Sequence, residues 1–251
     1  MTVAARLRLA RRIAGIAGAL ILCLPLHYAW KLAGRRSPWP RRFLFMVAFA
    51  AGMRPRVTGS PLKRQVLFLA NHVSWLDIML VAGTSGAAFV SKAEVADWPL
   101  FGWLASLNDS VFVAREQKRA VQGQADALRT ALAGGRAVAL FPEGTTEGGH
   151  RVLPFRASLL AALFPPLPGI RVQPVAIDYG PAVEDIAWVG DEGAAANALR
   201  ILSRKGIVPV GVHYLQPVDP QVAGDRKSLA RRSRDEIVER LRPSGAMADR
   251  L

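Results

Sequence analysis

The sequence is short of cysteine and histidine. Its 251 residues include one cysteine, Cys23, which excludes a disulfide framework and a cysteine-based zinc site. The four histidines stand at positions 27, 72, 150 and 213, and their spacing is unlike that of metal ligands. We therefore expect no metal in this protein.

Acidic residues are absent from the first part of the chain. Asp77 is the first, and thirteen lysines and arginines precede it, so residues 1–76 account for nearly all of the net charge of +14. Such a region binds either nucleic acid or an anionic membrane surface. The cations here are interleaved with apolar runs and not with stacking aromatic residues, which favours a membrane and argues against nucleic acid.

Two catalytic motifs are also missing. The chain has no Gly-x-Ser-x-Gly elbow, so nothing indicates a covalent acyl-enzyme. It has no Gly-x4-Gly-Lys-Ser/Thr loop, which argues against a kinase or hydrolase built around that phosphate cradle.

The N-terminal segment is apolar as well as basic. Residues 13–30 are uncharged, and as a helix they would extend about 27 Å, close to the roughly 30 Å of a bilayer core. A second arginine cluster precedes a shorter apolar run at 43–53. We expect residues 1–56 to form a membrane-anchoring helical element. Basic residues flank the long run on both sides, so spanning the bilayer and lying in one leaflet both stay open.

The remaining residues, 57–251, are expected to form one α/β domain, entered through a turn-rich stretch at 57–64. Apolar runs typical of strands alternate with segments of helical periodicity, which predicts a mixed, mostly parallel sheet covered by helices. Pro209 places the last strand near an edge of the sheet, and glycines at 83–86 break the first helix. The expected strands are 66–70, 87–91, 111–114, 137–141, 171–177 and 207–218. The first expected helix begins at 75. The other expected helices are 99–107, 117–133, 155–164, 192–205 and 229–241.

The stretch Val-Leu-Phe-Leu-Ala-Asn-His-Val-Ser-Trp-Leu-Asp at 66–77 organises the domain. A buried strand ends at Asn71-His72, and Ser74 with Asp77 matches a helix capping box. Asp77 can fold back to accept the Nδ1 proton of His72, which leaves Nε2 as a base. The alternative is that Ser74 and Asp77 only cap a helix and His72 is an ordinary turn residue.

Polar residues follow four of the expected strands. If these strands are neighbours, their ends meet at one edge of the sheet and bring together a base, cations, an acid and a glycine turn. That set suits attack of a hydroxyl on a thioester. The four clusters are Asn71-His72, Lys92, Arg115 and Glu143-Gly144-Thr145.

These motifs resemble a known family. Asn71-His72-x4-Asp77 paired with Phe141-Pro142-Glu143-Gly144-Thr145 is similar to the signature of the glycerolipid acyltransferases, typified by bacterial 1-acyl-glycerol-3-phosphate acyltransferase. Lys92-x-Glu94, Phe112-x-x-Arg115 and Pro174 fit the same pattern, over residues 57–218. The resemblance implies a lyso-lipid O-acyltransferase at the bacterial inner membrane, with its active site on the cytoplasmic side.

The resemblance also implies roles for individual residues. His72 would be the general base, Asp77 would orient it, and acyl-CoA or acyl-acyl-carrier protein would be the donor, with no cofactor besides this co-substrate. Alternatives stay open at two positions, because Arg115 could pair with Glu116 or Asp109 and Glu143 could cap a loop. The acceptor-binding residues that the resemblance implies are Lys92, Arg115, Glu143, Gly144, Thr145 and Thr146.

One departure from the family bears on the acceptor. The family continues with Thr-Arg-Ser, whose arginine binds phosphate, whereas this chain has Thr145-Thr146-Glu147. A bidentate phosphate ligand is lost and an acid is added. The pattern resembles the branch that acylates lyso-ornithine lipid, although Arg151 or Arg156 could replace the missing cation. Lysophosphatidate and lyso-ornithine lipid both remain as acceptors, and a non-enzymatic basic membrane-binding protein remains as the alternative of another class.

Overall fold

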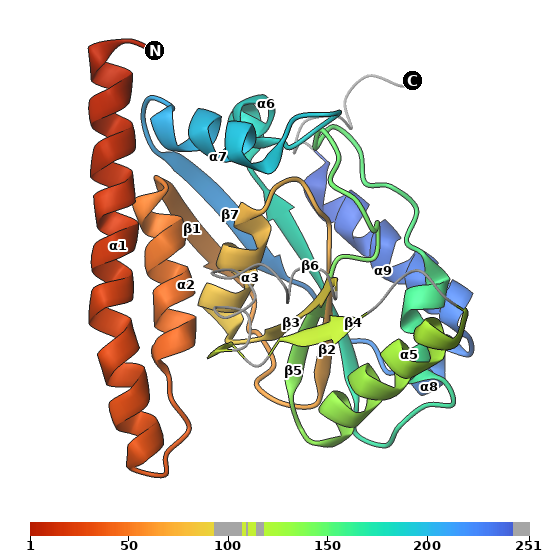
Figure 1. Cartoon of the computed structure of the whole chain (residues 1–251). Helices are drawn as coiled ribbons and strands as arrows, with labels where there is room; N and C mark the ends of the chain where they lie inside the picture. The colour runs from red at the N-terminus through yellow and green to blue at the C-terminus, as the bar shows by residue number, and fades with distance from the viewer. Residues whose placement is uncertain (93–106, 109, 114–117, 243–251) are drawn as a thin grey trace, which may run out of the picture.

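The computed structural model of the chain describes residues 1–92, 107–108, 110–113 and 118–242. Two helices come first and a mixed α/β region follows (Figure 1). The helices are α1 Val3–Leu32, α2 Trp39–Ala50, α3 Leu76–Ser85, α5 Lys118–Ala133, α6 Val183–Ile186, α7 Ala194–Ser203, α8 Pro220–Ala223 and α9 Arg226–Leu241, with 3-10 turns η2 Ala157–Leu163 and η3 Gly180–Ala182. The strands are β1 Met53–Thr58, β2 Val66–Ala70, β3 Ala88–Lys92, β4 Val111–Val113, β5 Ala137–Leu140, β6 Arg171–Asp178 and β7 Val208–Tyr214.

The described strands form one sheet in the order β1-β7-β6-β2-β5-β3-β4. Neighbours run parallel except for β6 and β7, which are antiparallel. The expected mixed, mostly parallel sheet is therefore confirmed. In this order β2, β5, β3 and β4 are successive parallel neighbours, so their carboxyl ends lie along the same edge.

Each face of the sheet carries its own apolar core, because side chains alternate along a strand. In β2, Val66 and Phe68 belong to the core beneath α2 and α3, whereas Leu67 and Leu69 belong to the core beneath α5, η2 and α9. This double burial explains why β2 reads as a continuous apolar run. Figure 1 shows α1, α2 and α3 on one side of the sheet and α5 and α9 on the other.

Two strand expectations are corrected. The chain at 57–64 is not all turn, because β1 continues through Val57 to Thr58 and forms the edge of the sheet. The strand β7 is shorter than expected, and it lies next to this edge strand, as Pro209 predicted. Pro209 is tolerated because β6 pairs with β7 only from Gly211 to Tyr214, so no β6 residue faces the proline.

Two helix expectations are also corrected. Gly83 does not break α3, which continues to Ser85 and ends at Gly86 in the left-handed conformation. A Cβ on Gly83 would lie 2.8 Å from the Phe45 Cα, so the glycine allows α2 and α3 to approach. The segment expected as a helix at 155–164 is a 3-10 turn, η2. The helix expected at 99–107 lies outside the described residues except for residue 107.

The N-terminal helices are joined to the sheet. Arg12 is buried on α1, and its guanidinium donates to the carbonyl oxygens of Ile201 at 2.8 Å and Gly206 at 2.7 Å, at the end of α7. Because β1 begins at Met53, four residues of the expected anchoring segment belong to the sheet. The division of the chain at residue 56 into two domains stays a prediction.

Candidate active site

His72 and Asp77 meet across the turn between β2 and α3. The His72 Nδ1 lies 2.9 Å from the Asp77 Oδ2, and the backbone N–H groups of Val73 and Ser74 donate to the same oxygen at 2.6 and 2.9 Å. The hydrogen bond from the Ser74 N–H to the Asp77 carboxylate is one of the two bonds of the expected capping box. The helix itself begins after Trp75. Asp77 is fully buried, whereas the His72 side chain keeps 17% of its surface exposed.

Tyr179 completes the surroundings of Asp77. Its hydroxyl donates to the Asp77 Oδ1 at 2.6 Å, from the position just after β6. Burial, and then the charge of Asp77, raise the pKa of Tyr179 well above its ordinary value, so this phenol is a permanent donor. Both carboxylate oxygens of Asp77 are therefore held, and the carboxylate in turn fixes the imidazole so that its Nε2 lone pair is the basic site.

The imidazole is also held by its neighbours. The His72 ring stacks on Phe141 with ring centroids 4.1 Å apart, and Phe141 stacks on Phe89. The preceding residue, Asn71, exchanges two side-chain hydrogen bonds with the backbone of Ile177, at 3.0 and 2.8 Å. This amide continues the β2–β6 pairing beyond the strand end and thereby fixes where His72 leaves the sheet.

The glutamate-glycine turn lies directly beside His72. The Glu143 Oε1 accepts from the His72 backbone N–H at 2.7 Å, and its Oε2 accepts from the Leu153 N–H at 2.8 Å. The backbone N–H of Glu147 donates to the His72 carbonyl at 3.0 Å. Burial raises the pKa of Glu143 to about 7, against the lowering effect of its two backbone donors. Its carboxylate thus ties two loops together, and a role in acceptor binding stays a prediction.

Position 144 requires a glycine. Its φ is +78°, and a Cβ there would lie 2.9 Å from the Arg156 Cζ, so the Arg156 guanidinium lies against the turn. The Thr146 hydroxyl donates to the Trp188 carbonyl at 2.6 Å, whereas Thr145 is exposed.

The structure describes the other predicted cations, Lys92 and Arg115, only in part. Lys92 is the last residue of β3, so its backbone lies at the same edge of the sheet as His72 and Glu143. Arg115 lies outside the described residues. Arg151 forms an ion pair with Glu147 at 3.4 Å, which leaves Arg156 as the cation beside the glycine turn. No group of three His, Cys, Asp or Glu side chains that could hold a metal ion occurs within the ranges that the structure describes.

Two residues of the site were not anticipated from the sequence. Tyr179 follows β6, just as His72 follows β2. The search for polar residues at strand ends would have found Tyr179 if it had included the end of β6. Trp188 gave no such signal: its N–H donates to the Val73 carbonyl at 2.9 Å and its carbonyl accepts from Thr146, from a loop with no recognisable motif.

A buried aspartate bonded to a histidine at a strand end, beside a glycine turn, gives this α/β fold the groups that a base-catalysed group transfer would need. Comparison with known proteins identifies the family to which the chain belongs. A family model described as Acyltransferase matches residues 54–178. The lyso-ornithine lipid O-acyltransferase of Rhizobium meliloti (strain 1021) is 38% identical, over 88% of this chain and 80% of the relative.

A second relative, the 1-acyl-sn-glycerol-3-phosphate acyltransferase of Neisseria gonorrhoeae, is 31% identical over 70% of this chain and 68% of its own. The crystal structure of the 1-acyl-sn-glycerophosphate acyltransferase PlsC from Thermotoga maritima superposes with a TM-score of 0.63 at 23% identity, covering 84% of this chain and 79% of that one, and so shares the fold. The chain belongs to the acyltransferase family. It is an enzyme, which excludes the non-enzymatic alternative.

Proposed function

We propose that this protein transfers a fatty acyl group from acyl-CoA or acyl-acyl-carrier protein to the free hydroxyl of lyso-ornithine lipid. The observation that carries the proposal is the glycine turn beside His72, which is followed by a hydroxyl and an acid where phosphate-binding relatives of the family have a cation. The name of the Rhizobium meliloti relative, which matches most of this chain, supports the same acceptor.

The chemistry follows from the histidine. The His72 Nε2 takes the proton of the acceptor hydroxyl as its oxygen attacks the thioester carbonyl carbon. Asp77, held by Tyr179 and two backbone N–H groups, stabilises the imidazolium that forms. The tetrahedral intermediate collapses with loss of the thiolate, which receives the proton from Nε2. An ester and a free thiol result.

The two candidate acceptors differ in the charge of their headgroups. An ornithine headgroup carries an ammonium and a carboxylate, whereas lysophosphatidate carries a phosphate with up to two negative charges. The Glu147 carboxylate forms an ion pair with Arg151, and the Arg156 guanidinium lies against Gly144, so charges of both signs flank the turn. Charges of both signs complement a zwitterion, and Glu147 lowers the net positive charge that a dianion would meet.

Lysophosphatidate is the second candidate. The observation that favours it is Arg156, because a guanidinium beside Gly144 supplies the bidentate phosphate donor that Thr146 lacks. The name of the Neisseria gonorrhoeae relative supports the same acceptor.

We also propose that the enzyme is a monotopic protein of the bacterial inner membrane, with its site on the cytoplasmic side, where both thioester donors are made. Helix α1 is long and apolar enough to span a bilayer, and only 17% of its apolar window is buried. However, Arg12 joins α1 to the end of α7, and Leu9 and Ile16 of α1 pack against the core of the α/β domain, so one face of this helix is covered by protein. Attachment along one leaflet satisfies both observations.

The test is an acceptor panel. Purified protein with radiolabelled acyl-CoA or acyl-carrier protein is offered lyso-ornithine lipid and lysophosphatidate separately. We expect turnover of lyso-ornithine lipid to exceed that of lysophosphatidate by about tenfold or more, because a contact to a charged group contributes about 1.5–3 kcal/mol. His72→Ala should abolish transfer. Product from neither acceptor, or full activity in His72→Ala, would overturn the proposal.

Thr146→Arg tests the acceptor-binding turn. We expect its preference to move toward lysophosphatidate, because the cation at this position is restored. Thr146→Met is the matched control, since it also loses the hydrogen bond to the Trp188 carbonyl but adds no charge. If both variants have the same preference, position 146 does not select the acceptor.

A further inference from the structure

A cavity lies far from His72, at the turn of the α1–α2 hairpin. It encloses about 190 Å³, more than ten times the volume that one water needs. It lies between the C-terminal end of α1, the N-terminal end of α2 and the starts of β3 and β5. The polar residues that line it are His27, Lys31, Arg35, Arg36, Ser37, Arg41, Asn108 and Arg136.

This cavity lies at the amino ends of the parallel strands, whereas the candidate active site lies at their carboxyl ends. Ala88 and Ala137, which line it, are the first residues of β3 and β5, whereas His72 follows the last residue of the parallel strand β2. At about 3.3 Å per residue, four or five residues of strand separate the two edges by roughly 15 Å. The cavity is therefore separate from the candidate active site beside Gly144.

Positive charge dominates the cavity. Five of its lining residues are lysine or arginine, and none of the lining residues is acidic in the part of the chain that the structure describes. Arg41 is held there by the carbonyl oxygens of Gly83 at 3.1 Å and Thr84 at 2.8 Å. These carbonyls position the guanidinium without neutralising it. Lys31, Arg35 and Arg36 are exposed and reach the cavity from the hairpin turn.

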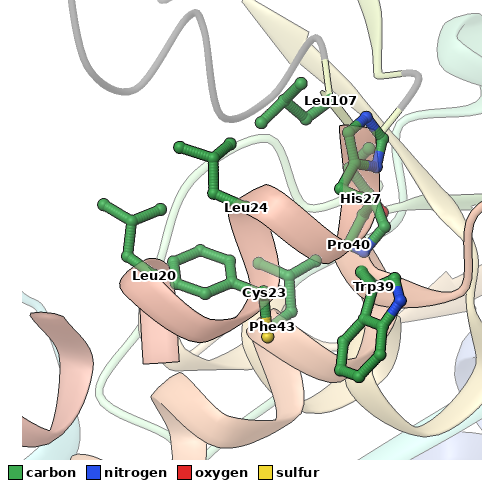
Figure 2. A pocket seen from close by; sticks show the side chains of 10 residues that line it. Leu20, Cys23, Leu24, His27, Trp39, Pro40, Phe43 and Leu107 are labelled. Carbon is green, nitrogen blue, oxygen red and sulfur yellow. The ribbon is translucent and has the colours of Figure 1, made fainter. Parts of the chain in front are cut away.

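A narrow apolar pocket, of about 30 Å³, adjoins the cationic cavity. The two share His27, Pro40, Leu107 and Asn108 in their walls. Figure 2 shows side chains of α1 and α2 around this pocket, with His27 and Leu107 near each other at one end. The other apolar wall residues are Leu20, Cys23, Leu24, Trp39, Phe43 and Leu44. A cationic cavity that continues into an apolar pocket matches an amphiphile with an anionic head.

The exposed surface of the hairpin points to the source of such an amphiphile. Several large apolar side chains of α1 and α2 are exposed, among them Ile21 at 74% and Leu32 at 89%. In the proposed attachment along one leaflet, on which this inference rests, the hairpin lies with this surface against lipid, and lipid headgroups reach the cavity at its tip. We propose that the cavity binds the headgroup phosphate of one anionic membrane phospholipid, whose acyl chain begins in the adjoining apolar pocket. This proposal does not depend on which acceptor the enzyme acylates.

The test compares two charge-matched variants of the full chain on vesicles of phosphatidylcholine with and without about one fifth phosphatidylglycerol. The hairpin variant carries Lys31→Gln, Arg35→Gln and Arg36→Gln. The control variant carries Arg226→Gln, Lys227→Gln and Arg231→Gln on α9. Each cation near an anionic surface strengthens binding about fivefold, so the hairpin variant should lose about 100-fold in affinity for phosphatidylglycerol vesicles. We expect the control to lose less than about threefold, and equal losses would overturn the proposal.

A retained-lipid measurement distinguishes a site from a diffuse patch. The detergent-purified protein, incubated with a mixture of phosphatidylglycerol and phosphatidylcholine, is examined by native mass spectrometry. We expect one phosphatidylglycerol per chain in the wild type and in the control, and none in the hairpin variant. Arg35→Gln alone should also reduce retention of phosphatidylglycerol. This single variant keeps the test valid if the triple variant fails to fold.

Two further arms identify the ligand. Leu24→Trp fills the apolar pocket and should reduce phosphatidylglycerol retention while the cations remain. Inorganic phosphate at millimolar concentration should not displace the lipid, because it lacks the acyl chain. Retention unchanged in Leu24→Trp, or displacement of the lipid by phosphate, would overturn a lipid site. All of these readouts measure binding, so they are independent of the acyl-transfer assays.

Discussion

The hydrogen bond from Tyr179 to Asp77 provides a sharp test of the site. Tyr179→Phe removes the donor to the Asp77 Oδ1, at 2.6 Å in a fully buried position, and leaves the ring in place. Hydrogen bonds to a charged group contribute about 1.5–3 kcal/mol. We expect the free energy of unfolding to fall by that amount. If about half of this energy, roughly 0.75–1.5 kcal/mol, orients Asp77 for the imidazolium in the transition state, kcat falls about 4- to 12-fold.

Tyr214→Phe is the matched control. Tyr214 is equally buried, but its hydroxyl shares a 2.6 Å hydrogen bond with the Thr84 Oγ1 and does not contact Asp77. We expect a loss of about 1 kcal/mol in stability and less than about a twofold change in kcat. Urea unfolding gives the stabilities, and initial rates over a range of acceptor concentrations separate kcat from KM.

The split between kcat and KM decides the role of Tyr179. A positioning residue of the base lowers kcat and leaves the acceptor KM within about twofold, because it acts on the transition state. If Tyr179→Phe has the kcat of the wild type, or if both tyrosine variants lower kcat equally, then Tyr179 only contributes to packing and the reasoning is refuted.

Three further predictions concern the same site. Asp77→Asn should lower kcat by about 10³-fold or more, since an amide cannot accept from all the donors that hold Asp77; initial rates on a correctly folded variant check this. Gly144→Ala should lower the free energy of unfolding by about 1–2 kcal/mol, because alanine is strained at φ +78° and its Cβ displaces Arg156; urea unfolding checks this, and an unchanged midpoint would contradict it. The raised pKa of Glu143, about 7, means that folding favours its protonated form, so its contribution to stability is complete below the unfolded value of 4.5 and is lost as the pH rises through about 7. The stability of the wild type relative to Glu143→Gln should therefore decline between about pH 5 and about pH 8 in paired unfolding curves, and a constant or rising difference would be inconsistent with the buried carboxyl.

Local sequence determined the pairing of His72 with Asp77. His72 and Asp77 are five residues apart across a strand-to-helix turn, and three of the four hydrogen bonds to the Asp77 carboxylate come from residues 72–74. Short-range geometry of this kind is fixed by the backbone of the turn, so a motif is enough to predict it. The same holds for β2, whose continuous apolar run reflects burial on both faces.

The tertiary structure decided the contacts between distant segments. Tyr179 is 102 residues from Asp77 in sequence and reaches it because β6 lies beside β2. Arg156 comes to lie against Gly144, and Arg12 joins α1 to α7, through the packing of whole elements. The position of β7 inside the sheet likewise depends on its pairing with β1. No local pattern encodes the order of strands, since that order results from the burial of both faces of the sheet at once.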